Sequence, residues 1–151
     1  MLFDSDAVDA KLIGVEYIIS EKLFNQLPES ERQLWHSHRY EVKSGLLMAP
    51  RLPDMAEKEL MKEMVTTYGK TFHFWRVDRG DVLPVGGPRL MMAFTRDGQV
   101  KNDIVEKLEE QAGSSVEHKR KHRSDITEHE ILPGADAWQD GNVVQVTLAY
   151  K

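Results

Sequence analysis

The segment DMAEKELMKEMVTTYGKTFHFWRVD (residues 54–78) decides the fold class, because its pattern changes from helical to extended. The first part carries one broad apolar stripe at helical spacing, formed by Leu60, Met61, Met64, Val65 and Tyr68. We predict a helix that has Asp54 as its N-cap and Gly69 as the residue after its last turn. The aromatic-rich residues 71–78 then predict a strand, so the segment joins a helix to a strand.

Hydrophobic patterns on both sides of this segment predict the other elements. The expected strands cover residues 12–19, 89–94 and 142–150, and the expected helices begin after Ser20, begin after Pro28 and cover residues 102–112. Strands 71–78 and 89–94 are expected to form a hairpin with a long loop rich in glycine and proline. This irregular order argues for an α+β fold instead of repeated βαβ units. We predict a single domain over residues 1–151, with a mixed or antiparallel sheet and three to four helices.

Composition limits the classes of function. The formal net charge of −5 and the pI of about 5.7 argue against a general nucleic-acid-binding protein. The chain has no cysteine, so it has no disulfide and no thiolate nucleophile, which fits a reducing cytoplasm. The longest apolar run, Leu90–Phe94, is far shorter than the about 20 residues that cross a bilayer. We expect a cytoplasmic protein without a signal peptide or transmembrane segment, in which contact with lipid is peripheral. The oligomeric state is left open, and the alternatives include a homodimer.

The stretch LWHSHRYEVKSG (residues 34–45) contains the most informative polar side chains, His36, His38 and Glu41. On a strand, the two histidines would lie on one face, about 7 Å apart. On a helix, His38 and Glu41 would be neighbours three positions apart. Imidazole and carboxylate ligands together suit zinc, iron or manganese, and they also suit acid–base chemistry near neutral pH. A structural role is the third alternative, in which Glu41 pairs with a neighbouring cation and the histidines donate to backbone carbonyls.

A third imidazole, His73, lies on the predicted strand 71–78 and could complete this set if the fold brings it to the same cavity. The predicted catalytic residues are His36, His38, Glu41 and His73, and the alternative metal ligands are His36, His38 and Glu41. Trp35 and Trp75 adjoin these residues in the sequence and are expected to form the walls of an apolar pocket. The candidate cofactor is a divalent metal ion, and its identity is left open.

The basic run HKRKHR (residues 118–123) holds four permanent positive charges. Near an anionic membrane each such charge contributes about 1 kcal/mol of attraction. The acidic residues that flank the run and partly cancel its field are Glu117, Asp125, Glu128 and Glu130. We therefore interpret the run as a solvated surface helix.

Several stretches together resemble the oil body-associated protein family of plants and microbes. They are FDSDAVDAKLIGVEYIIS (3–20), LFNQLPESERQLWHSHRYEVKSGLLMAPRLPDM (23–55) and TTYGKTFHFWRVDRGDVLPVGGPRLMMAF (66–94), together with the region of Trp138. The most specific combination is the Trp-His-Ser-His block with its following Glu-Val-Lys-Ser-Gly, plus Asp-Arg-Gly-Asp-x-Leu-Pro. The resemblance is good over residues 3–95 and loose over the rest.

The resemblance implies association with oil bodies or lipid droplets, where the family bears on droplet size and stability, and it carries over no catalytic residue. It also implies a preceding segment with further His and Cys residues, so this chain resembles an N-terminally shortened member. Two hypotheses follow. The first is a cytoplasmic protein that binds an apolar ligand or a droplet surface. The alternative is an enzyme of specialised metabolism that acts on a small hydrophobic substrate through the His/Glu pocket.

Overall fold

The computed structural model describes residues 1–147 and 149 and shows an α+β fold, which confirms the predicted fold class. The strands of its antiparallel sheet are β1 (Leu2–Phe3), β2 (Leu12–Ser20), β3 (His36–Ser37), β4 (Thr67–His73) and β5 (Arg89–Met91). The α-helices are α1 (Glu21–Phe24), α2 (Glu29–Arg32), α3 (Arg39–Ser44), α4 (Asp54–Met64), α5 (Asn102–Ala112) and α6 (Val116–His122). Two 3-10 helices are η1 (Val77–Arg79) and η2 (Ala137–Asp140). The six described α-helices outnumber the predicted three to four, and α1, α2 and α3 have only one or two turns.

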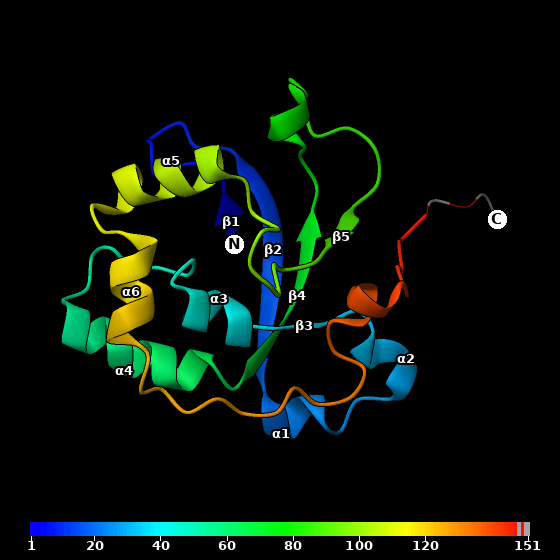
Figure 1. The fold of residues 1–151 in the computed structure, drawn as a ribbon. Helices are drawn as coiled ribbons and strands as arrows, with labels where there is room; N and C mark the ends of the chain where they lie inside the picture. The colour runs from blue at the N-terminus through cyan, green and yellow to red at the C-terminus, as the bar shows by residue number, and fades with distance from the viewer. Residues whose placement is uncertain (148, 150–151) are drawn as a thin grey trace.

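Strand β4 is the central strand, since neighbouring strands pair with both of its edges (Figure 1). β2 pairs along the whole of one edge. The other edge is shared by β3, at Tyr68 and Gly69, and by β5, at residues 71–73, so the predicted hairpin of β4 and β5 is confirmed. Because side chains alternate along a strand, Tyr68 points to one face of the sheet, whereas Thr71 and His73 point to the other.

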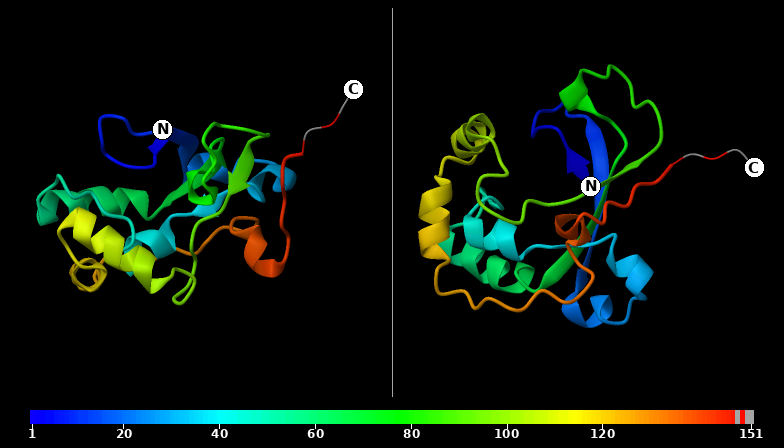
Figure 2. Two further views of the ribbon diagram at one scale, coloured as in Figure 1. Left: turned by 90° about the horizontal axis from the view of Figure 1, so that it is seen from above. Right: turned by 45° about the vertical axis from the view of Figure 1, so that its right-hand side comes forward.

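Apolar packing covers the face of Tyr68. This ring stacks on Phe24 with 3.9 Å between the ring centroids, and both rings pack with Trp35. The helices α3, α4, α5 and α6 gather to one side of β2 and β4 (Figure 2). A second core lies among these helices and consists of Val42, Met61, Val65 and Ile126. The opposite face, which carries Thr71 and His73, bears both polar and apolar side chains, among them Glu16 and Ile18 of β2.

The helix in the opening segment is shorter than predicted. α4 ends at Met64 and β4 begins at Thr67, whereas the prediction continued the helix into this strand. Three consecutive residues branched at Cβ, 65–67, favour an extended backbone at this point. The predicted strand 71–78 is displaced for the same reason, since β4 already ends at His73.

The predicted C-terminal strand is absent from the described residues 142–147 and 149, which carry no regular structure. Gln145 meets β5 through its side chain, because its Nε2 atom donates to the carbonyl of Leu90 at 3.2 Å. A side-chain contact of this kind replaces the backbone ladder that a strand would form. Leu148 and Tyr150, which belong to the same prediction, lie outside the described residues.

The basic run forms α6, but the interpretation as a solvated surface helix holds only in part. The ammonium group of Lys119 binds Asp54 at 2.8 Å and Glu57 at 2.6 Å, and Arg123 approaches Glu57 at 3.1 Å. Lys119, Arg123 and Glu57 are buried. Asp54 is the first residue of α4, and its predicted N-cap position belongs to Pro53. Two of the four permanent charges in the run therefore join α6 to α4 and are not available to a membrane.

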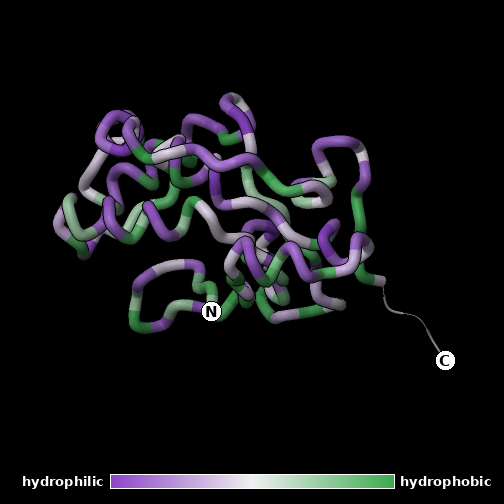
Figure 3. The backbone as a smooth tube through the Cα atoms, turned by 90° about the horizontal axis from the view of Figure 1, so that it is seen from below, coloured by the Kyte–Doolittle hydropathy of each residue, from purple (hydrophilic) through white to green (hydrophobic). Residues whose placement is uncertain are grey.

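No helix in the part of the chain that the structure describes is long and apolar enough to cross a bilayer. Hydrophilic and hydrophobic stretches alternate over short distances along the backbone (Figure 3). α5 ends as predicted at Gly113, which has a left-handed conformation with φ of 63°. Glycine adopts this conformation without the steric cost that a side chain would add.

Candidate functional site

A cavity of about 390 Å³ lies on the sheet face that carries Thr71 and His73. Its polar lining consists of Glu16, His36, His38, Glu41, Thr71 and His73. Its apolar lining consists of Leu2, Ile18, Leu47, Met64, Met91, Met92 and Ala93. This size falls within the range of about 300–1,000 Å³ that is typical of small-molecule sites, and an apolar wall with a few convergent polar groups is their usual composition.

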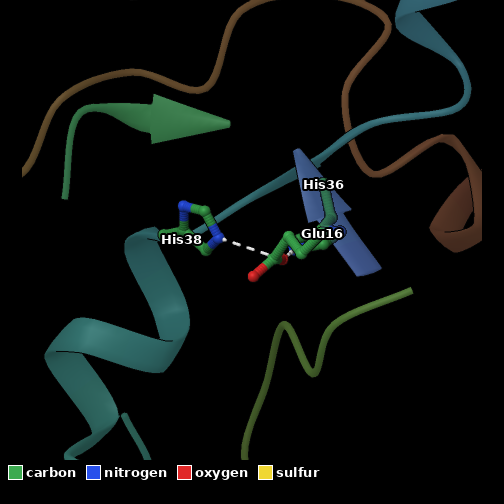
Figure 4. Close-up of side chains that lie close together, drawn as sticks. All are labelled: Glu16, His36 and His38. Carbon is green, nitrogen blue, oxygen red and sulfur yellow. Dashed lines mark hydrogen bonds and ion pairs between the residues drawn. The ribbon is translucent and has the colours of Figure 1, made fainter. Parts of the chain in front are cut away.

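Three of the polar side chains converge at one point, as Figure 4 shows. The Oε1 atom of Glu16 lies 3.1 Å from Nε2 of His36 and 3.5 Å from Nε2 of His38. One donor atom from each residue lies within 4.8 Å of the other two, so the three side chains could hold a metal ion. Both imidazoles are buried, whereas Glu16 is half-buried at the cavity.

The register of the sheet brings two of these residues together. Glu16 on β2 pairs with Thr71 of β4, and His36 on β3 pairs with Gly69 of β4, two residues away on the same face. Gly69 provides the space between them. A Cβ atom at this position would lie 2.5 Å from Oε1 of Glu16 and 2.6 Å from Nε2 of His36. The cluster therefore requires a residue without a side chain at position 69.

His38 reaches the cluster from the point where the chain changes from strand to helix. It is the N-cap residue of α3, and its backbone N–H extends the sheet pairing by donating to the carbonyl of Thr67 at 3.2 Å. Glu41 lies in the first turn of the same helix. The sequence analysis considered a strand or a helix for this motif. The structure contains both, because the strand ends at Ser37 and the helix begins at Arg39.

Two threonines orient the cluster. Thr71 donates its hydroxyl hydrogen to Oε1 of Glu16 at 2.9 Å. Thr67 donates to the carbonyl of Met64 at 2.7 Å, and its Oγ1 atom lies 2.8 Å from Nδ1 of His38. Because a hydroxyl has a single hydrogen, Nδ1 of His38 must carry the hydrogen of the second bond. In a neutral imidazole, Nε2 of His38 then presents a lone pair to Glu16.

The cavity shifts the pKa values of its carboxyl and imidazole groups in different directions. Burial alone would raise the pKa of Glu16, but hydrogen bonds from His36, His38 and Thr71 outweigh it and hold this pKa well below its usual range. Burial raises the pKa of Glu41, and it lowers the pKa of His73. Burial thus shifts Glu41 towards its protonated form and His73 towards its neutral form, and both side chains face the same cavity.

The structure brings the predicted histidines and Glu41 to the same cavity, but it places them in different positions. His36 and His38 belong to the three-residue cluster, whereas Glu41 and His73 line the cavity outside it. The carboxylate of the cluster comes from Glu16, which the sequence analysis did not select. One signal for Glu16 was available, since it is the only charged residue in the otherwise largely apolar strand LIGVEYIIS.

The two tryptophans predicted as pocket walls lie elsewhere among the described residues. Trp35 is buried in the core beside Phe24 and Tyr68, and its indole N–H donates to Glu31 at 3.0 Å. The indole N–H of Trp75 donates to the carbonyl of Asp81 at 2.8 Å, in the loop after η1. Methionines occupy the apolar wall instead, and their unbranched side chains adapt to ligands of different shape.

The fold and the cavity together define an α+β protein with a histidine–carboxylate pocket, and comparison with known proteins identifies the family. A family described as "Protein of unknown function (DUF1264)" matches residues 1–127. The chain is 45% identical to oil body-associated protein 1A of Zea mays over 143 residues, which are 93% of this chain and 60% of that protein. It is 45% identical to oil body-associated protein 1B of Arabidopsis thaliana over 131 residues, which are 87% of this chain and 54% of that protein.

The chain therefore belongs to the DUF1264 family, to which the resemblance to oil body-associated proteins had pointed. Oil body-associated protein 2A of Zea mays shows the same level of similarity, with 45% identity over 91% of this chain and 56% of that protein. The chain thus spans a little over half the length of these curated relatives. No solved structure matches the chain.

Proposed function

We propose that this chain associates peripherally with the surface of lipid droplets and that the loop between η1 and β5 makes the contact. The relatives' names, oil body-associated proteins, support the lipid surface as the partner. The observation that carries the proposal is the exposure of this loop: Val82 leaves 84% of its surface exposed and Leu83 leaves 65%. Two adjacent branched apolar side chains with this exposure are suited to insertion among acyl chains.

The loop is held in a defined shape by Arg76. Its Nε atom donates to the carboxylate of Asp81 at 3.2 Å, and Nη2 donates to the carbonyl of Val85 at 3.2 Å, so one side chain joins both ends of the apolar tip. The loop extends beyond the end of β4 and β5 in Figure 1. Arg79 and Arg89 flank it and are exposed, which favours an anionic lipid surface. A fixed tip loses less conformational entropy on insertion than a flexible one would.

Replacing both tip residues by aspartate, Val82→Asp with Leu83→Asp, should lower binding to phospholipid-coated triolein droplets by more than about tenfold. Full burial of one aliphatic side chain contributes about 1.5–3 kcal/mol, and about 1.4 kcal/mol corresponds to a tenfold change in partitioning. Droplet flotation at several lipid concentrations measures the effect. Met55→Asp is the matched control, because Met55 is similarly exposed on α4, and it should bind like the wild type. Equal flotation of all three proteins would exclude this loop as the contact.

A second candidate function is catalysis on a small hydrophobic molecule in the cavity. The observation that favours it is the combination of Glu41 and His73, whose pKa values are shifted in opposite directions, with a wall made largely of apolar side chains. Glu41 would donate a proton and His73 would accept one, while the methionines of the wall contact the apolar part of the substrate. The droplet would then be the source of the substrate.

This candidate predicts that the wild-type protein consumes a compound that the double variant Glu41→Gln with His73→Gln leaves intact. Both proteins would be incubated with an apolar metabolite extract from droplet-rich cells, and the extract would be compared by mass spectrometry before and after. Circular dichroism spectra and melting curves would establish that the double variant is folded. Identical extracts after incubation with both proteins would refute the enzymatic candidate and leave droplet association unaffected.

A further inference from the structure

We propose that Glu16, His36 and His38 form a mononuclear site for a divalent transition-metal ion, with its free coordination positions directed into the cavity. Two imidazole nitrogens and one carboxylate oxygen are a ligand set that suits zinc, iron or manganese. The ion is held by β2, by β3 and by the N-terminal end of α3, so it links three elements of the fold. This site does not depend on droplet association, and it stands whether or not the cavity is catalytic.

The spacing of the donor atoms suits a shared ion. Ligand bonds of about 2.0–2.2 Å in tetrahedral geometry separate neighbouring ligand atoms by about 3.2–3.6 Å. The carboxylate oxygen of Glu16 lies 3.1 Å from His36 and 3.5 Å from His38, close to this range. A charge-assisted hydrogen bond between imidazolium and carboxylate would be shorter, at about 2.7–2.9 Å. The distance to His36, 3.1 Å, also suits an ordinary N–H···O hydrogen bond, whereas the distance to His38, 3.5 Å, is longer than such a bond.

The hydrogen bond between His38 and Thr67 provides an independent argument. Since Thr67 donates to Met64, Nδ1 of His38 carries a hydrogen, and the lone pair on Nε2 of the neutral ring points at the carboxylate of Glu16. A lone pair and a carboxylate oxygen repel each other, and either a second proton on His38 or a metal ion between the two atoms removes this repulsion. Metal-bound histidines typically donate their other ring N–H to an oxygen acceptor, as His38 does to Thr67. Thr71 holds the carboxylate of Glu16 in the same manner.

The protein chain itself supplies the space for the ion. Gly69 lies against both Oε1 of Glu16 and Nε2 of His36, which any side chain at this position would displace. The remaining directions around the cluster open to the cavity, where the apolar wall would exclude bulk water from a ligand bound to the metal. Three protein ligands with open positions are the arrangement of metal sites that bind or activate a ligand, whereas structural sites are closed by four.

Titration of the purified protein with Co²⁺ tests the site, because cobalt bound to nitrogen and oxygen ligands shows visible d–d absorption. We expect one saturable equivalent per chain, and an affinity loss of more than about 100-fold in His38→Gln and in Glu16→Gln, since ligand loss should exceed the 10–100-fold cost of removing an outer-shell partner. His73→Gln is the matched control. It removes an imidazole from the same cavity but outside the cluster, and it should bind Co²⁺ like the wild type.

A pair of variants at Thr67 separates orientation from folding. Thr67→Val removes the acceptor for Nδ1 of His38 at nearly constant volume and should weaken Co²⁺ binding by about 10–100-fold. Thr67→Ser keeps the hydroxyl and should retain the affinity. No saturable Co²⁺ absorption in the wild type would overturn the proposal, and so would an equal loss in His73→Gln and His38→Gln. Equal affinity in Thr67→Val and Thr67→Ser would overturn the role of His38 as an oriented ligand. If a histidine variant fails to fold, the Thr67 pair and Glu16→Gln still decide the question.

Discussion

Glu57→Gln should lower the free energy of unfolding by about 3–5 kcal/mol, although it changes one carboxylate to an amide of nearly equal size. Glu57 is fully buried on α4 and carries the negative charge that faces two buried cations. Its Oε2 atom accepts a hydrogen bond from Lys119 at 2.6 Å, and its Oε1 atom lies 3.1 Å from Arg123. The amide would leave both cations without their buried counter-charge. Removal of one partner from a buried ion pair is costly for this reason.

The same carboxylate predicts how stability depends on pH. Burial alone would raise the pKa of Glu57, but hydrogen bonds from the backbone of Ala49 and from Lys119, with the charge of Arg123, lower it below the ordinary value. A group whose pKa is lower in the folded state contributes stability above its unfolded pKa and loses it as the pH falls through the folded pKa. Stability of the wild type should therefore decline in acid, and the difference between the wild type and Glu57→Gln should shrink there.

Urea denaturation at neutral and acidic pH measures both effects, and Glu59→Gln is the matched control. Glu59 lies on the same helix and pairs with Lys62 at 2.7 Å, but both side chains are largely exposed. Exposed pairs of this kind add little stability, so Glu59→Gln should unfold at nearly the same urea concentration as the wild type. Similar midpoints for Glu57→Gln and Glu59→Gln would contradict the assigned role of the buried network.

Gly69→Ala should abolish Co²⁺ binding while it leaves the fold intact. The added Cβ would lie 2.5 Å from Oε1 of Glu16 and 2.6 Å from Nε2 of His36, so both donor atoms must move away from their present positions. These atoms are the ends of side chains, and Gly69 has the backbone of an extended strand, which alanine also adopts. The strand therefore persists, at an overpacking cost of about 1–3 kcal/mol. The affinity for Co²⁺ should fall by more than about 100-fold.

The control for this variant is Gly98→Ala, which destabilises the fold without touching the cavity. Gly98 has φ of 83°, where alanine is strained, and no atom lies within 4 Å of an added Cβ. Its expected cost is about 1 kcal/mol. Melting curves and Co²⁺ titrations on both variants distinguish a local effect from a general one. If Gly98→Ala lost as much affinity as Gly69→Ala, the loss would reflect stability and not the geometry of the cluster.

The sequence predicted most of the polar side chains that line the cavity. His36, His38, Glu41 and His73 were selected because imidazole and carboxylate groups suit metal binding and acid–base chemistry, and all four line one cavity. The antiparallel pairing of β4 with β5 was also expected, from their apolar composition and the glycine-rich loop between them.

Other features depend on the register of the sheet, which local patterns do not determine. Glu16 faces His36 only because both β2 and β3 pair with β4, on opposite edges. Thr67 was assigned to a helix, so its hydroxyl could not be placed beside His38. The inward role of Lys119 was missed because a run of like charges usually lies in solvent, and its acidic partners are more than 60 residues away in the chain.

The position of β4 has a consequence for how the molecule fluctuates. A strand that is paired on both edges exchanges its amide hydrogens only when a large part of the structure opens, whereas marginal elements open more often. The floor of the cavity, which includes Thr71 and His73, is on this strand, but Leu2 and Met91 of its wall belong to the short strands β1 and β5. We therefore expect any molecule that enters or leaves to pass along β1 and β5 while Thr71 and His73 stay in place.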